Sequence, residues 1–168
     1  MIDPNYVREM ARYNSWQNHQ LVEALKDVDE AVLRADRGAF FGSILATLNH
    51  VLWGDTIWMS RFDPSIAPPD KGRPHTDYTP DFASWRAARV QMDAGISAWA
   101  GALRNDGLDG TLTWHSGMTG RDLTKPLAVC VMQLFNHQTH HRGQVHAMLT
   151  AAGLKAPVSD LAFMPEDF

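Results

Sequence analysis

Residues 127–152 read LAVCVMQLFNHQTHHRGQVHAMLTAA. Apolar side chains recur along this segment at helical spacing, so that they lie on one face of a helix. That face comprises Leu127, Val131, Leu134, Val145 and Met148. Pro126 precedes the pattern and Gly153 follows it, and these residue types are typical of helix ends. We therefore predict a long helix from Pro126 to about Ala152.

Three further segments carry the same periodicity. They run from about Asn5 to about Val28, from about Phe41 to about Phe62, and from about Asp81 to about Arg104. The first opens with Asp3 and Pro4, a favourable N-cap and first-turn pair. Helices of about 20 residues are about 30 Å long, and four of them can pack side by side. The predicted fold class is therefore all-α, a four-helix bundle.

The connections between these helices differ in character. The segment Asp63–Pro80 contains five prolines, which exclude a regular helix or a central strand. We predict a long surface crossover, which lets the second and third helices run parallel. Between the third and fourth helices, alternation rich in Thr and Trp predicts a short β-hairpin that pairs Thr111–His115 with Met118–Thr124. The tail from Lys155 to Phe168 is expected to hold one short helical turn.

The composition is that of one globular domain spanning residues 1–168. Apolar residues make up 45% of the chain, enough for a core of useful size. The net charge of −4 and the lack of a basic run argue against nucleic acid as a partner. The single cysteine, Cys130, excludes an intrachain disulfide and a metal cage built from several cysteines.

The sequence also predicts no membrane partner. No apolar run approaches the ~20 residues that a membrane span needs. The first residues, MIDPNYVREM, lack the charged and then apolar layout of a signal peptide. We therefore expect a cytoplasmic protein.

Four of the eight histidines crowd into the last predicted helix. His137 and His141 are in phase with its apolar stripe, and residues at i and i+4 project from neighbouring turns of one face. Two imidazoles so placed can bind one cation, but a third ligand is needed. His50, near the middle of the second helix and among small residues, is the best candidate. From the spacing alone, the alternative that these three histidines are hydrogen-bonded core residues without a metal has equal weight.

Three histidines and a water molecule would form an open site. Such a site is typical of catalytic rather than structural zinc. Imidazole ligands suit Zn²⁺, Ni²⁺, Co²⁺ and Fe²⁺ and do not distinguish among them.

The residues around these histidines form a recognisable motif, since residues 136–144 read NHQTHHRGQ. This segment resembles the H-x-x-x-H-R-G-Q signature of the last helix in the DinB/YfiT-like superfamily. Residues 48–58, LNHVLWGDTIW, resemble its motif of a His followed by D-x-x-W, and residues 13–18, YNSWQN, are similar to its opening Y-N-x-W-x-N. The resemblance covers essentially the whole chain, with the motifs in the right order.

This resemblance implies a four-helix bundle with a long crossover, a homodimer, and a metal held by His50, His137 and His141. The superfamily includes S-transferases and isomerases that use bacillithiol, mycothiol or glutathione. We therefore expect a metal-dependent enzyme, with zinc or nickel first, that transfers a low-molecular-weight thiol to a small-molecule substrate. The alternatives are a metal-dependent hydrolase and a non-catalytic stress protein that binds a metal or a small molecule. Neither chemistry has an identified general base, so no catalytic residue is assigned.

Two charged residues fall on predicted inner faces. Asp55 lies in phase with the apolar stripe of the second helix, and we expect a structural ion pair with Arg8, Arg12 or Arg61. Arg89 interrupts the stripe of the third helix. It is expected to be paired or snorkelled at the bundle rim, with binding of an anionic substrate as the alternative.

The sequence also gives expectations for the other polar residues and for the cysteine. Arg142 and Gln144, within the last motif, are expected to make a salt bridge or a dimer contact, or else to support the ligand histidines. Cys130 is expected to be an inert core thiol. His19, His75 and His115 are expected at the surface.

Overall fold

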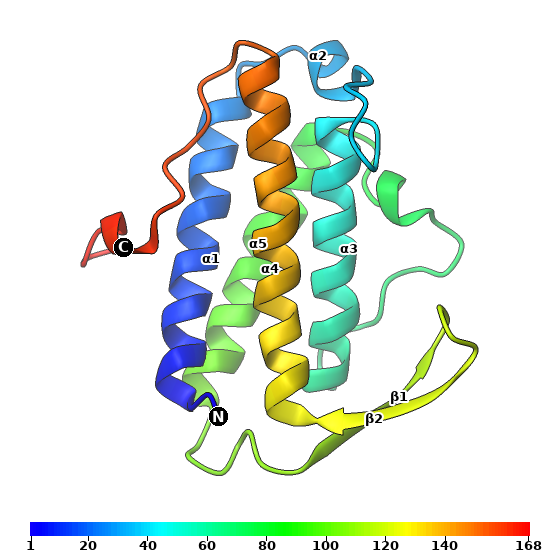
Figure 1. The fold of residues 1–168 in the computed structure, drawn as a ribbon, viewed down its shortest axis with the longest axis vertical. Helices are drawn as coiled ribbons and strands as arrows, with labels where there is room; N and C mark the ends of the chain where they lie inside the picture. Colours follow the sequence, from blue (N-terminus) through cyan, green and yellow to red (C-terminus); the bar gives the residue numbers. More distant parts are fainter.

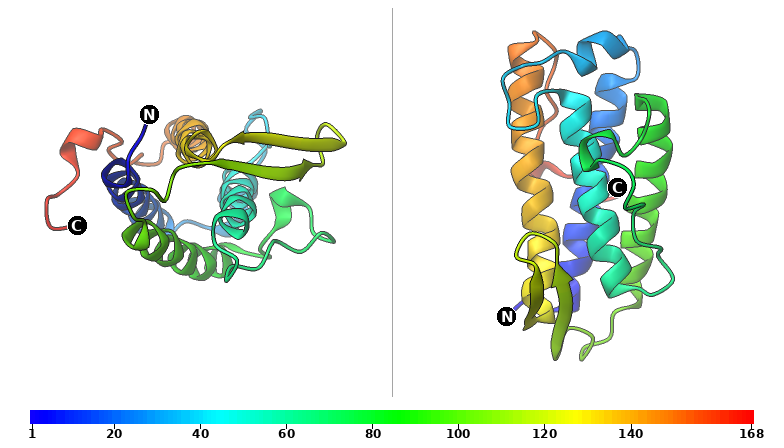
Figure 2. Two further views of the ribbon diagram at one scale, coloured as in Figure 1. Left: turned by 90° about the horizontal axis from the view of Figure 1, so that it is seen from below. Right: turned by 90° about the vertical axis from the view of Figure 1, so that its right-hand side faces the viewer.

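The computed structural model describes residues 1–168, which form a mostly helical chain with one small antiparallel sheet. Four helices are long: α1 (Pro4–Leu25), α3 (Ile44–Phe62), α4 (Phe82–Ala102) and α5 (Leu127–Ala151). They lie side by side along the long axis of the molecule (Figure 1). Helix α3 packs against both α4 and α5, and α1 packs mainly against α4 (Figure 2). A short helix, α2 (Glu30–Arg34), was not predicted.

Polar side chains fix where the helices begin. Asp3 accepts a hydrogen bond from the Tyr6 amide at 2.9 Å, as expected for an N-cap. Ser43 caps α3, so this helix begins three residues later than the predicted Phe41. Helix α1 ends at Leu25 rather than Val28, because the chain turns there and Asp29 caps α2.

The two long connections have the predicted character. The crossover between α3 and α4 contains only one short 3-10 helix, η1 (His75–Asp77), and it returns the chain so that α3 and α4 run in the same direction (Figure 1). The hairpin pairs β1 (Thr111–Ser116) with β2 (Arg121–Pro126), with Thr113 opposite Thr124. Its second strand begins at Arg121 rather than Met118, because residues 117–120 form the turn. The tail holds the short η2 (Leu161–Phe163).

The interior is divided into two apolar clusters. One surrounds Leu25, Ile44 and Trp85, and the other surrounds Val7, Met59 and Phe135. Between them, all four long helices contribute buried polar side chains at the same level. We call this set the polar layer: Asn14, Asn18, Asp55, Arg89, Asp93, Gln138 and Arg142. None of the helices combines the length and the apolar character that crossing a bilayer requires.

Candidate metal centre

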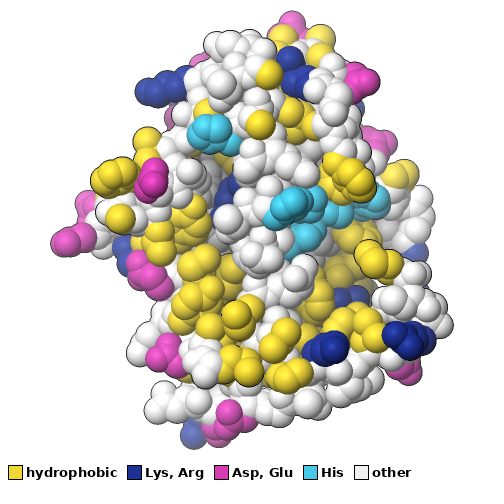
Figure 3. Space-filling view, in the orientation of Figure 1, with side chains coloured by type: hydrophobic (Ala, Val, Ile, Leu, Met, Phe, Trp, Pro, Cys, Tyr) yellow, Lys and Arg dark blue, Asp and Glu magenta, His cyan; other side chains and the backbone are white.

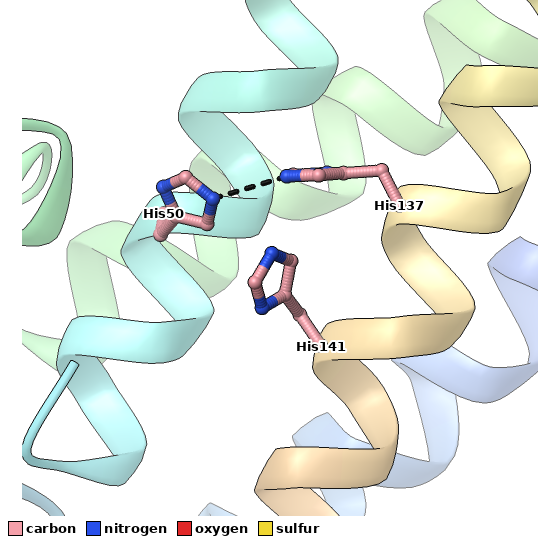
Figure 4. A group of neighbouring side chains, drawn as sticks. All are labelled: His50, His137 and His141. Carbon is pink, nitrogen blue, oxygen red and sulfur yellow. Dashed lines mark hydrogen bonds between the residues drawn. The ribbon is translucent and has the colours of Figure 1, made fainter. Parts of the chain in front are cut away.

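Three histidines converge between α3 and α5. His50 projects from α3, and His137 and His141 project toward it from successive turns of α5 (Figure 4). Each residue offers one ring nitrogen, and the three nitrogens lie within 4.8 Å of one another. Nε2 of His50 is 3.0 Å from Nε2 of His137. The structure thus brings together the three histidines that the sequence singled out.

The spacing and the charge state of these rings suit a metal ion. Ligand nitrogens around a tetrahedral zinc are about 3.3 Å apart, given Zn–N bonds of about 2.0–2.1 Å. Burial, followed by repulsion from His137, His141 and His75, lowers the pKa of His50 to about 3. Burial and the neighbouring histidines likewise lower the pKa of His137 to about 4. Burial also lowers the pKa of His141, although Gln144 acts in the opposite direction. At neutral pH the imidazoles are therefore uncharged, which is the form that binds metals.

A glycine on α3 makes room for one of these rings. A Cβ atom added at Gly54 would lie 2.7 Å from Cε1 of His137 and 3.2 Å from its Nδ1. Real Cβ atoms do not approach other atoms so closely, so any larger residue would displace the ring. Gly54 follows His50 by one helical turn, and the imidazole of His137 therefore lies directly against the backbone of α3.

Hydrogen bonds orient two of the three rings. Nδ1 of His141 lies 2.7 Å from Oε1 of Gln144 and donates its proton to that amide oxygen, which leaves Nε2 as the nitrogen with a free lone pair. Gln144 thus orients one of the three clustered histidines, and it makes no salt bridge. Nδ1 of His50 lies 2.9 Å from Nδ1 of His75. Nδ1 of His137 is buried and has no partner.

The position of His75 corrects a prediction. His75 was expected at the surface, but it is half-buried against His50 at the start of η1. The sequence carried no periodic signal for it, because it lies in the irregular crossover. The one available clue was that the crossover is long enough to fold back onto α3.

Aromatic side chains wall the site. The ring centroid of Phe41 is 4.2 Å from that of His50 and 5.4 Å from those of His75 and His141. Trp53 stacks beside His50 at 6.1 Å. Figure 3 shows the histidines gathered on one face of the molecule, next to hydrophobic side chains. A substrate bound at the triad would therefore meet imidazole and apolar rings. Phe41 was not predicted as a site residue, whereas Trp53 was expected in the core or in the wall of a pocket.

The polar layer contains the ion pairs that the sequence assigned differently. Asp55 is paired with Arg89 at 2.5 Å, and not with Arg8, Arg12 or Arg61. Arg89 also contacts Asp93 at 2.8 Å and is only 1% exposed, so it lies in the interior and not at the rim. Burial raises the pKa of the Asp55 carboxyl, and the Arg89 guanidinium opposes that shift. Because Arg89 has two carboxylate partners, this geometry does not favour an anion-binding role.

The other sequence-derived candidates lie outside the triad. Arg142 is buried, donates to Oδ1 of Asn14 and lies over the Tyr13 ring, and therefore belongs to the polar layer. Cys130 is buried in α5, as predicted, and burial raises the pKa of its thiol. His19 and His115 are exposed, as predicted.

A mostly helical protein with a three-histidine cluster between two helices is the class that these observations define. The family model described as the DinB family matches residues 1–167, and the chain belongs to this family. A comparison with curated proteins found no match.

Proposed function

We propose that this protein binds a divalent transition metal through His50, His137 and His141 and is a metal-dependent enzyme acting on a small molecule. The observation that carries the proposal is the convergence of three uncharged imidazoles whose donor nitrogens lie within 4.8 Å. Three protein ligands leave a position for water or for a substrate atom, as in catalytic zinc sites. Zinc and nickel are the first candidates, and iron and cobalt also suit imidazole ligands.

The favoured chemistry is transfer of a low-molecular-weight thiol. A bound metal lowers the pKa of a thiol that coordinates it and so makes the sulfur a nucleophile at neutral pH. The thiol would arrive as a co-substrate, because Cys130, the only cysteine, is 2% exposed. Phe41 and Trp53 would pack against the apolar part of the electrophile, and Gln144 would hold His141 in its binding orientation.

Hydrolysis is the second candidate function. It requires a group that accepts a proton near the metal. His140 is exposed, its ring centroid lies 4.8 Å from that of His141, and it is not one of the converging ligands. An imidazole beside the triad that is not a ligand is suited to proton transfer, and Nε2 of His140 lies 3.4 Å from Nε2 of Gln144.

The proposal extends to the whole chain. We infer that the four long helices form a four-helix bundle in a single domain, residues 1–168, as in the DinB family. We further propose a homodimer. Its support is a group of exposed apolar side chains, Tyr6, Val129 and Met132, on the lower parts of α1 and α5, where Figure 3 shows hydrophobic atoms on the surface.

Metal content tests the first part of the proposal. Protein purified without added metal is analysed by elemental mass spectrometry, together with His50→Ala, His137→Ala and His141→Ala. We expect bound metal in the wild type and little in the variants. His146→Ala is the matched control, since His146 is an exposed histidine on the same helix. Ligand variants that retain wild-type metal content would refute the metal site.

Activity tests the second part. The metal-loaded protein is assayed with several thiols against a panel of electrophiles, and without thiol against a panel of esters. Turnover that needs both thiol and metal supports the transferase, whereas metal-dependent ester cleavage supports the hydrolase. Inactivity throughout, combined with tight retention of metal, would indicate a non-catalytic binding protein.

A further inference from the structure

The crossover brings a fourth histidine into contact with the triad. His75 opens η1, and its Nδ1 lies 2.9 Å from Nδ1 of His50. The other nitrogen of His50, Nε2, lies 3.0 Å from Nε2 of His137. The two nitrogens of His50 therefore face different partners, one in the triad and one in the crossover.

The direction of the hydrogen bond follows from the chemistry of imidazole. A neutral ring carries one proton, so one nitrogen donates and the other accepts. If Nε2 of His50 binds a metal, it must present its lone pair, and the proton lies on Nδ1. Nδ1 of His75 then accepts a hydrogen bond from Nδ1 of His50, and the proton of His75 lies on its own Nε2.

The segment that carries His75 is fixed to α3 beside His50. The buried Asn49, which precedes His50, accepts hydrogen bonds from the backbone amide and the hydroxyl of Thr79, both at 2.8 Å. The rings of Phe41 and Trp53 each contact both His50 and His75. The polar contacts of Thr79 and the aromatic contacts of Phe41 and Trp53 thus hold this segment, and His75 with it, beside His50.

We propose that His75 is a positioning residue for the metal centre. By accepting a hydrogen bond from Nδ1 of His50, it fixes the ring orientation and the tautomer in which His50 presents Nε2 to the metal. Gln144 does the same for His141, but from within the same helix. The inference rests on the proposed metal site, and it adds that a segment outside both ligand helices determines how tightly the site binds the metal.

Two substitutions separate the hydrogen bond from packing. His75→Phe keeps an aromatic ring between Phe41 and Trp53 but removes the acceptor. His75→Asn loses the ring but places an amide oxygen near the position of Nδ1. Removing such an outer hydrogen bond typically weakens metal binding about 10–100-fold, and we expect this loss in His75→Phe. His75→Asn should stay closer to the wild type than to His75→Phe.

The affinity for Zn²⁺ is measured by competition with a chromogenic chelator, and circular dichroism and urea unfolding without metal verify the fold. Co²⁺ serves as a spectroscopic probe. If His75 only positions His50, the visible absorption bands of wild type and His75→Phe agree at saturating Co²⁺. Bands that change at saturation would overturn the proposal, because His75 would then itself be a ligand.

The remaining outcomes distinguish a failure of the proposed metal site from a failure of the role proposed for His75. A wild-type protein that binds no Zn²⁺ would refute the proposed function and the inference together. Tight binding by the wild type and equal affinity in His75→Phe would refute the role of His75 alone. Equal losses in both variants would also refute it, because packing and not the hydrogen bond would then account for the effect.

Discussion

Neighbouring residues of α5 contribute to two polar regions that behave in opposite ways. His137 and His141 face α3 and form the triad with His50, whereas Gln138 and Arg142 belong to the polar layer. In the polar layer the charged groups pair with one another, because Arg89 contacts both Asp55 and Asp93. In the triad, three nitrogens of the same kind converge, and no carboxylate balances them.

This difference indicates what each region does. Removing one partner of a buried ion pair leaves an uncompensated charge in the interior, so the complete pairs disfavour other arrangements of the helices. The converging imidazoles are neutral, and their ring nitrogens are of the kind that a divalent cation takes as ligands. We therefore expect substitutions in the polar layer to change stability, and substitutions around the triad to change metal affinity.

The largest effect is expected in the polar layer. Arg89→Met leaves Asp55 and Asp93 buried without their cation, and breaking a buried pair in this way costs about 3–5 kcal/mol. Urea unfolding of the metal-free protein measures the loss. Lys26→Met is the control, because its partner Glu23 lies on the surface, and its unfolding midpoint should not move.

A second variant keeps this test decisive if Arg89→Met does not fold. Asp55→Leu combined with Arg89→Met removes one buried charge of each sign and should be more stable than Arg89→Met alone. If the wild type and Arg89→Met were equally stable, the ion pairs of the polar layer would not stabilise the fold, and this prediction would be wrong.

The next effect concerns the ring of His137. Gly54→Ala places a methyl group 2.7 Å from Cε1 of His137, so the ring must move. We expect Zn²⁺ affinity to fall about 10–100-fold, the range seen when ligand orientation is disturbed. Gly95→Ala is the matched control, since its Cβ would meet only Cδ1 of Ile66, at 3.7 Å. Unchanged affinity in Gly54→Ala would mean that His137 does not bind in the position described.

The features of the fold and of the site that the sequence predicted are those that helical periodicity determines. Within a helix the 3.6-residue repeat fixes which side chains share a face, so His137 and His141 could be placed together, and the four long helices and the hairpin could be located. The same repeat showed that Asp55 faces inward. It could not show which helix lies opposite, and the partner proved to be Arg89.

The remaining features depend on packing between segments that have no common repeat. His75 lies in an irregular crossover, so no pattern predicted its contact with His50. Small residues were expected around His50, but the contact of one of them, Gly54, with His137 depends on the separation of α3 and α5. That the three histidines bind a metal stays a prediction.

A smaller effect is expected at Gln144. Gln144→Ala removes the acceptor for Nδ1 of His141, and Zn²⁺ affinity should fall about tenfold, the lower end of the usual range. Gln144→Glu keeps an acceptor oxygen and should retain the affinity. Gln133→Ala, an exposed glutamine on the same helix, is the control. Equal affinity in Gln144→Ala and Gln133→Ala would show that this hydrogen bond does not support the site.

The smallest expected effect is the pH dependence of the free energy of unfolding of the metal-free protein. In the folded state the pKa of His50 is lowered to about 3 and that of His137 to about 4, from an ordinary value of 6.5. As the pH falls below 6.5, the unfolded chain binds protons at these residues and the folded protein does not. Linkage then requires the free energy of unfolding to decrease as the pH is lowered. We expect no contribution from these groups well above pH 6.5 and a shallow decline from there toward pH 5.

Urea unfolding in the presence of a chelator, at several values between pH 8 and pH 5, measures this slope. Both rings are partly exposed, so solvent screens the effect, and it should be smaller than that of Arg89→Met. Combining His50→Gln with His137→Gln removes the titrating groups and should flatten the slope, whereas His146→Gln, at an exposed position, should preserve it. If the double variant kept the wild-type slope, the responsible protons would bind elsewhere. The lowered pKa values of His50 and His137 would then not account for the pH dependence of stability.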